Sequence, residues 1–294
     1  MDYYDEIKSE LIGSEANRKI KNYSINKSDL NAYYNVGKIL SEAGKHYGDG
    51  IIREYSKKLT IEVGKGYGIS NLKRMRQFYY MVEKGVALPH QLSWSHILKL
   101  LPLTDVTEIN YYINVTIANN YGYRELGNLI KNDEYGRLDI DTKNKLVNGG
   151  NYDVIDFVKN PILIKNCYNY EIVSEKILQK LILEDIAFFM KELGSGFSFI
   201  DNEYKIKVGD RYNYIDLLLY NIKFKCYVVV ELKVTELSYN HTGQIQNYMN
   251  YVDKNIKNID DNKTVGIIIC KKNNKYVIEY CSDNRIIARE YELL

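Results

Sequence analysis

Two carboxylates and one lysine, spaced along two apolar runs, are the residues of this sequence best suited to chemistry. Glu231 and Lys233 close the apolar run 226–230, and Asp216 lies in the branched and aromatic run 214–220. Both runs have strand-like composition, and the polar break between them is short enough for a hairpin. A chain that folds back in this break brings Asp216 within a residue or two of the position opposite Glu231. Glu231 and Lys233 share one face because side chains alternate along a strand.

This constellation predicts a site for a hard divalent cation. Two carboxylates so close repel each other, and a cation with oxygen ligands relieves that repulsion. Mg²⁺ held by Asp216 and Glu231, with the Leu232 carbonyl as a further donor, would polarise a phosphoryl oxygen and lower the pKa of a bound water. Lys233 would orient that water or offset charge on phosphorus. The alternative is a strand that simply emerges into solvent with charged residues at its end.

Several segments around these residues recur together in a known family. The C-terminal segments are Lys-Glu-Leu-Gly-Ser-Gly-Phe-Ser-Phe-Ile at 191–200, Tyr-Asn-Tyr-Ile-Asp-Leu-Leu-Leu-Tyr at 212–220, Val-Glu-Leu-Lys at 230–233, Gly243-Gln244 with Tyr248, and Thr-Val-Gly-Ile-Ile-Ile-Cys at 264–270. This succession resembles the C-terminal domain of the YhcG-like family, a branch of the PD-(D/E)XK nuclease superfamily. The N-terminal half resembles the same family's companion domain through Gly-Tyr-Gly-Ile-Ser-Asn-Leu at 66–72, Met-Arg-Gln-Phe-Tyr at 75–79 and Leu-Ser-Trp-Ser-His at 92–96.

The resemblance implies a bacterial, metal-dependent nuclease fold and assigns roles to individual positions. Asp216, Glu231 and Lys233 would form the catalytic motif, and Gln244 would reach the site from the following helix. Related nucleases often add a glutamate from the first helix of the domain, and the matching position is Glu184. Gln244 could equally be an ordinary residue near a helix start, and Glu184 an ordinary solvated charge.

One position departs from the family pattern. The family commonly has Pro-Glu shortly before the Gly-Gln pair, where this chain reads Tyr239-Asn240. If the missing carboxylate assists the ion or the substrate, full activity is in doubt.

A basic segment in the N-terminal half suggests contact with nucleic acid. Residues 44–84 contain nine lysines and arginines against four acids, although the whole chain carries a net charge of only +2. The pattern predicts a helix over 51–63, a glycine-rich break, and a second helix capped by Ser70. That second helix would leave open the side-chain types that read bases and hold phosphates: Asn71, Lys73, Arg74 and Gln77. The alternative is a solvated helix face that never touches nucleic acid.

Length and composition restrict the number of domains, the association with membranes and the state of the cysteines. The 294 residues suit two domains, and a hydrophobic content of 45% supports real cores. The N-terminus is acidic and predicts no signal peptide, and no run approaches the roughly 18 apolar residues that span a membrane. The cysteines lack metal-ligand spacing and predict reduced, buried thiols in a cytoplasmic protein, without zinc: Cys167, Cys226, Cys270 and Cys281.

Other catalytic patterns are not supported. The four histidines share no metal-ligand spacing: His46, His90, His96 and His241. We predict a packing or capping role for His96, whereas His241 could begin a helix or lie near a scissile phosphate. The glycine-rich segment 64–68 lacks the spacing of a Walker motif.

The order of predicted elements indicates an α/β (α+β) protein in two parts. Residues 1–150 would form a mostly helical, nucleic-acid-binding domain that ends in a linker at 131–151. Residues 151–294 would form the PD-(D/E)XK domain, a restriction-endonuclease-like mixed sheet flanked by helices. A single helix over 174–193 would begin it, and a hairpin formed by 276–280 and 285–291 would end it.

The sequence therefore predicts a Mg²⁺- or Mn²⁺-dependent endonuclease acting on DNA, with the N-terminal domain holding the substrate. Cutting both strands of a duplex would favour a homodimer. The alternative is a nucleic-acid-binding or complex-assembly subunit that retains the nuclease fold and has weak or no activity.

Overall fold

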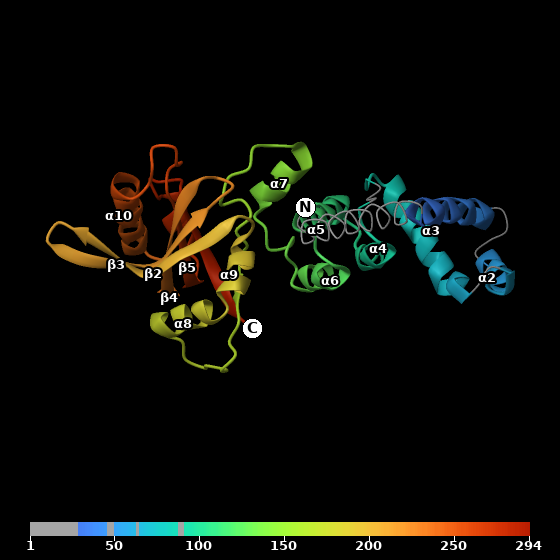
Figure 1. The fold of residues 1–294 in the computed structure, drawn as a ribbon, viewed down its shortest axis with the longest axis horizontal. Coiled ribbons are helices and arrows are strands. Elements are labelled where there is room, and N and C mark those ends of the chain that lie inside the picture. Colours follow the sequence, from blue (N-terminus) through green and yellow to red (C-terminus); the bar gives the residue numbers. More distant parts are fainter. Residues whose placement is uncertain (1–28, 46–49, 63–64, 88–90) are drawn as a thin grey trace, which may run out of the picture. The chain divides into compact units, whose positions relative to one another are not determined.

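The computed structural model describes residues 29–45, 50–62, 65–87 and 91–294, and the chain divides into two compact units (Figure 1). The first unit ends at Tyr135 and the second begins at Gly136. The division expected at residue 150 stays a prediction. The segment 131–151, expected to be a linker, contains the helix α7 (Ile140–Asn148). Val63, Gly64, His46 and His90 lie outside the described residues.

The described part of the first unit is helical, as the sequence predicts. A helix over residues 29–45 precedes the other elements, which are α2 (Ile51–Glu62), the 3-10 helix η1 (Lys65–Tyr67), α3 (Ile69–Glu83), α4 (Trp94–Leu100), α5 (Val106–Asn119) and α6 (Tyr123–Lys131). The α3 helix buries one stripe at helical spacing, as amphipathic helices do: Leu72, Met75, Phe78 and Met81.

A glycine allows the helix over 29–45 to approach α3 closely. A Cβ atom placed on Gly37 would lie only 2.2 Å from the carbonyl oxygen of Met75. Leu40 and Ile52 complete the buried contact with Leu72 and Met75. The close approach therefore depends on the absence of a side chain at residue 37.

The second unit is built on a six-stranded mixed sheet with the order β1-β6-β5-β4-β3-β2. Strands β2, β3 and β4 pair antiparallel, and β4, β5, β6 and β1 pair parallel. The strands are β1 (Ile162–Ile164), β2 (Phe197–Val208), β3 (Arg211–Asn221), β4 (Cys226–Glu236), β5 (Val265–Lys272) and β6 (Ile286–Leu293). The mixed sheet and its helices agree with the predicted fold class.

Helices cover both faces of this sheet. The other helices of the unit are α8 (Glu175–Glu184), α9 (Ile186–Leu193), α10 (Tyr239–Asn255) and α11 (Lys275–Glu279). Along β4, Val228 and Val230 pack in the core with α8 and α9, whereas Val229 packs in the core with α10. This alternation is what a strand buried on both faces requires.

Two predicted elements differ in the structure. The single helix expected over 174–193 is divided at Asp185, whose side chain accepts the N–H of Phe188 and caps α9. The hairpin expected at the C-terminus is wrong, because residues 275–279 form α11 and β6 then pairs parallel with β5.

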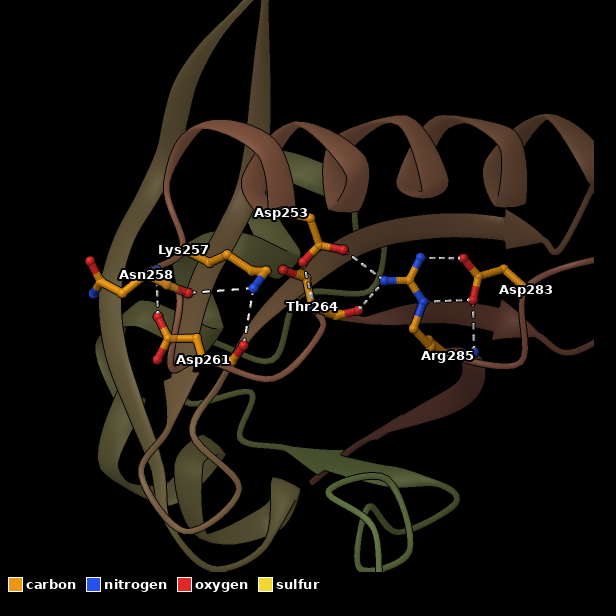
Figure 2. Close-up of polar contacts among 7 residues, drawn as sticks. All are labelled: Asp253, Lys257, Asn258, Asp261, Thr264, Asp283 and Arg285. Carbon is orange, nitrogen blue, oxygen red and sulfur yellow. Dashed lines mark hydrogen bonds and ion pairs between the residues drawn. The ribbon is translucent and has the colours of Figure 1, made fainter.

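A network of charged side chains fixes the C-terminal end of α10 to the start of β5 (Figure 2). Arg285 bonds Asp253 of α10 at 2.8 Å and the Thr264 carbonyl at 3.1 Å, while Asp283 contacts the same guanidinium at 2.6 Å. Asp253 also accepts the N–H of Thr264 at 2.8 Å. This end of α10 is therefore anchored, which holds its N-terminal end in a fixed position.

Candidate active site

The register of β3 on β4 brings Asp216 and Glu231 together, as the hairpin argument predicts. The β3–β4 ladder ends with the pair Leu217 and Val230, so the next positions on the two strands are Asp216 and Glu231. At the next position a side chain, rather than a backbone carbonyl, accepts the hydrogen bond from β4: Oδ2 of Asp216 accepts the N–H of Leu232 at 2.8 Å. The two carboxylates therefore lie where β3 and β4 separate.

Glu231 is buried and only half satisfied. Its residue is 2% exposed. Its Oε2 accepts Nζ of Lys233 at 3.3 Å and Nε2 of Gln244 at 3.2 Å. Its Oε1 is buried and has no hydrogen-bond partner. A buried carboxylate oxygen without a partner is costly, and in native proteins it often marks a binding or catalytic position.

The electrostatics of the pair follow from burial. Burial, and then the negative charge of Asp216, raise the pKa of Glu231 from 4.5 to about 8. Burial also raises the pKa of Asp216, against the opposing effect of the Leu232 N–H. Burial alone would lower the pKa of Lys233, but the nearby carboxylates of Glu231 and Asp216 raise it. The lysine therefore stays charged while Glu231 exchanges a proton near neutral pH.

The acid of α8 that contacts this cluster is Glu175, whereas the sequence predicted that Glu184 would lie there. Glu175 lies in the first turn of α8, and its Oε2 is 3.7 Å from Nζ of Lys233. Glu184 is the last residue of the ten-residue helix, roughly 13 Å further along the axis, and pairs with Lys180 at 3.8 Å. A second residue of α8, Gln179, donates to the main-chain carbonyl of Asp216 at 3.0 Å. The sequence reasoning missed both Glu175 and Gln179.

Gln244 reaches the cluster from α10, as predicted. Besides Glu231, its amide nitrogen donates to the hydroxyl of Tyr248 at 3.1 Å. His241 takes part in a capping box with Ser238 and accepts its N–H at 3.2 Å, so it lies at the helix start as one of the two interpretations predicts. Tyr239, the first residue of the helix, is exposed.

The donor set suits a hard cation better than zinc. Among the residues that the structure describes, no cluster of three or more His, Cys, Asp or Glu side chains could hold a metal. Mg²⁺ is usually bound by one or two carboxylates plus waters and substrate phosphates, and needs no larger protein cage. The unpartnered Oε1 of Glu231, beside the carboxylate of Asp216, fits that type of ligand set.

The four residues predicted on the first unit divide into two kinds. Lys73 and Arg74 are exposed on α3, and neither forms an ion pair with another residue that the structure describes. Asn71 donates to the Gly66 carbonyl at 2.7 Å and accepts from the indole of Trp94 at 3.3 Å. Gln77 donates to the carbonyl at the end of α4 at 3.1 Å. Asn71 and Gln77 therefore stabilise the helical unit, and only the two cations are free to meet a phosphate.

The capping role predicted for His96 is confirmed, whereas the burial predicted for the cysteines holds for Cys226 and Cys270 but not for Cys167, which is exposed, or Cys281, which is partly exposed. His96 lies in a capping box with Ser93 and its other ring nitrogen is 3.1 Å from the Tyr121 carbonyl, so its role is in capping. The cysteines are free thiols, with Cys226 and Cys270 buried. No helix of the described residues is long and apolar enough to cross a membrane.

The mixed sheet flanked by helices is the fold of a PD-(D/E)XK nuclease domain. Residues 155–294 match the family described as the YhcG PDDEXK nuclease domain, and residues 8–137 match the DUF1016 N-terminal domain. The chain therefore belongs to the YhcG-like family of PD-(D/E)XK nucleases, with its N-terminal companion domain.

Known proteins similar to this chain include one from Escherichia coli (strain K12), named "Putative nuclease YhcG". It is 22% identical over 293 residues, covering 86% of this chain and 78% of that protein. Among solved structures, a repair endonuclease from Pyrococcus abyssi is 18% identical with a TM-score of 0.29. An EndoMS complex with double-stranded DNA is 19% identical with the same TM-score. Each match covers 44% of this chain and about half of the matched chain.

Proposed function

We propose that this protein is a Mg²⁺- or Mn²⁺-dependent endonuclease that hydrolyses phosphodiester bonds in DNA. The observation that carries the proposal is the buried Glu231, with one oxygen held by Lys233 and Gln244 and the other without a partner. Asp216 and Glu231 would hold the cation. When bound, a divalent cation supplies a polarised phosphoryl oxygen and a water of lowered pKa.

The side chains of the chain itself would complete the chemistry. Lys233 stays charged and would stabilise negative charge that develops on the phosphate oxygens. Gln244 fixes the orientation of Glu231 through a bond of 3.2 Å. Glu175 lies on the other side of the lysine ammonium at 3.7 Å and would hold it in place. Preorganised groups of this kind lower the reorganisation needed in the transition state.

The first unit would hold the substrate through Lys73 and Arg74. Both are exposed cations at neighbouring positions of α3, where they can neutralise phosphates. Replacing both with Ala is expected to lower the slope of log affinity against log salt by about 1.8 for duplex DNA. An unchanged slope would limit α3 to a structural role. Cutting both strands of a duplex in one binding event favours two active sites, so we further propose a homodimer for that reaction.

The direct test is cleavage by the purified protein. Plasmid and single-stranded DNA would be incubated with Mg²⁺, Mn²⁺ or EDTA, and products followed on gels. We expect cleavage that needs the metal and falls at least 100-fold in Asp216→Asn and in Lys233→Ala. Glu184→Gln, an equivalent change outside the cluster, is the control. Cleavage that survives either site variant would refute the assignment.

A second candidate function is a nucleic-acid-binding or assembly subunit with weak or no activity. The Tyr239-Asn240 pair favours it, because no carboxylate stands at the first turn of α10. Substitution of Asn240 by Glu separates the two functions. A large gain in cleavage by this variant would favour the binding role of the natural chain, whereas an unchanged rate shows that the carboxylate is not needed.

A further inference from the structure

The β2–β3 hairpin continues well beyond the strands that hold it in the sheet. Pairing of β3 with β4 ends at Leu217, whereas its pairing with β2 continues to Arg211 opposite Val208. Figure 1 shows this hairpin reaching outward past α10. Its distal half is therefore a two-stranded ribbon with only part of its surface covered.

One face of this ribbon is covered and the other is open. Ile206 and Ile215 are buried in the core that includes α10. On the opposite face, Lys205 pairs with Tyr214 and Lys207 pairs with Tyr212, so two lysines and two tyrosines form a ladder. We call these four residues the Lys/Tyr ladder.

The Lys/Tyr ladder is exposed and combines aromatic rings with positively charged side chains. Tyr212 is 57% exposed and Tyr214 is 51% exposed. The ammonium of Lys205 lies 3.9 Å from the centre of the Tyr212 ring, in a cation–π contact. Large exposed aromatic rings interleaved with cations form the surface on which unpaired bases stack while phosphates are neutralised.

The ladder leads to the candidate active site. Tyr212 and Tyr214 precede Asp216 at every second position of β3, so they lie about 14 Å and 7 Å from it along the strand. Glu203, on the neighbouring strand, is close enough to contribute to the raised pKa of Asp216. A strand bound on the ladder would therefore be within a few nucleotides of the carboxylates.

We propose that the Lys/Tyr ladder binds a single-stranded segment of nucleic acid and guides it to Asp216 and Glu231. The proposal rests on the proposed function of that site and names the form of its substrate. Bases stack on Tyr212 and Tyr214, and Lys205 and Lys207 neutralise the neighbouring phosphates. The ladder thus selects unpaired strands, such as flaps, gaps or opened ends, over intact duplex.

The test measures binding separately from cleavage. Fluorescence anisotropy of a labelled single strand of about 20 nucleotides would be recorded in EDTA, in the Asp216→Asn background. Changing Tyr212 and Tyr214 to Ala is expected to weaken binding at least tenfold. Changing Lys205 and Lys207 to Ala should reduce the salt slope by about 1.4.

Matched controls lie at the two ends of α11, where Tyr276 is in the first turn and Tyr280 is the C-cap. Tyr276 and Tyr280 are 68% and 71% exposed, and changing both to Ala is expected to leave binding within twofold. The ladder variants change exposed side chains, and thermal melting would verify that each still folds. A labelled duplex of the same sequence should lose less than threefold from the tyrosine changes.

Three results would overturn the proposal. The first is single-strand binding that is unchanged in the ladder variants, and the second is equal losses for single strand and duplex. The third is a change of oligomeric state in sedimentation velocity, which would make the ladder a contact between two copies of the chain. Cleavage that survives Asp216→Asn would instead refute the proposed active site while leaving the binding result intact.

Discussion

Replacing the buried Glu231 with Gln should stabilise the metal-free protein, and increasingly so as the pH rises. The pKa of Glu231 is raised from 4.5 to about 8 in the folded protein. Between these values the unfolded chain has lost the proton and the folded chain still holds it. Stability therefore falls as the pH rises through this window, and the loss is complete above about pH 8.

The size of the effect follows from the shift. Each pKa unit corresponds to about 1.36 kcal/mol, so ionised Glu231 lowers the free energy of unfolding by about 5 kcal/mol at pH 9. At pH 5 the corresponding loss is only about 1 kcal/mol. Gln fills the same space and does not ionise. The stability advantage of Glu231→Gln over the natural protein should therefore grow by about 4 kcal/mol between pH 5 and pH 9.

Urea denaturation in EDTA at several pH values measures this difference. Glu184→Gln is the matched control, because it removes a carboxylate outside the cluster whose side chain is 32% exposed and which pairs with Lys180 across one helical turn. Its difference from the natural protein should not vary by more than about 0.5 kcal/mol over the same range. If Glu231→Gln also shows a constant difference, Glu231 has an ordinary pKa and the burial argument fails.

Three other substitutions test separate parts of the account. Gln244→Glu places a second carboxylate beside the buried Glu231, which should raise the pKa of Glu231. The half-maximal pH of cleavage in a pH–rate profile should therefore rise by about one unit. An unchanged profile would contradict the contact between the two side chains. Glu175→Gln should slow cleavage about tenfold and Glu184→Gln less than twofold in initial-rate assays, whereas equal effects would remove the distinction between the two ends of α8. Gly37→Ala should lower the free energy of unfolding, measured in urea, by about 1–3 kcal/mol, because the new Cβ atom would lie 2.2 Å from a carbonyl oxygen. Gly66→Ala serves as the control, because a Cβ atom at residue 66 has no neighbouring atom within 4 Å.

The placement of Asp216 beside Glu231 was predictable because it depends on local rules. Two strand-like runs joined by a short break fix the register, and the register places Asp216 opposite Glu231. Gln244 was predictable for the same reason, since an amphipathic helix shortly after the strand places its first turns near the strand end. The sequence did not show that Glu231 Oε1 would lack a partner, because that depends on every neighbouring side chain.

The sequence reasoning chose the wrong end of α8 for the acid near Lys233, because one polar residue divides the helix that it treated as continuous. The sequence read 174–193 as continuous and located the acid by counting back from Gly194. Asp185 ends α8 and caps α9, so the N-terminal end of α8 faces the cluster. The signal was present: Ser174 is an N-cap, and it places Glu175 in the first turn.

The open side of α3 shows a different limit of sequence reasoning. Its amphipathic pattern correctly left Asn71, Lys73, Arg74 and Gln77 off the buried stripe. Pattern alone does not reveal long-range hydrogen bonds, and two of these residues bond to other parts of the helical unit. A residue off the core stripe is therefore only a candidate for binding until its partners are known.

Anomalous diffraction from crystals grown with Mn²⁺ at pH 8.5 tests the central claim most directly, because Glu231 is then ionised. We expect one strong manganese peak within coordination distance of Asp216 and of Glu231 Oε1, and loss of that peak in Asp216→Asn. A peak bound by other residues, or no peak at saturating Mn²⁺ in a structure that keeps both carboxylates in place, would contradict a metal-dependent nuclease site at these strand ends.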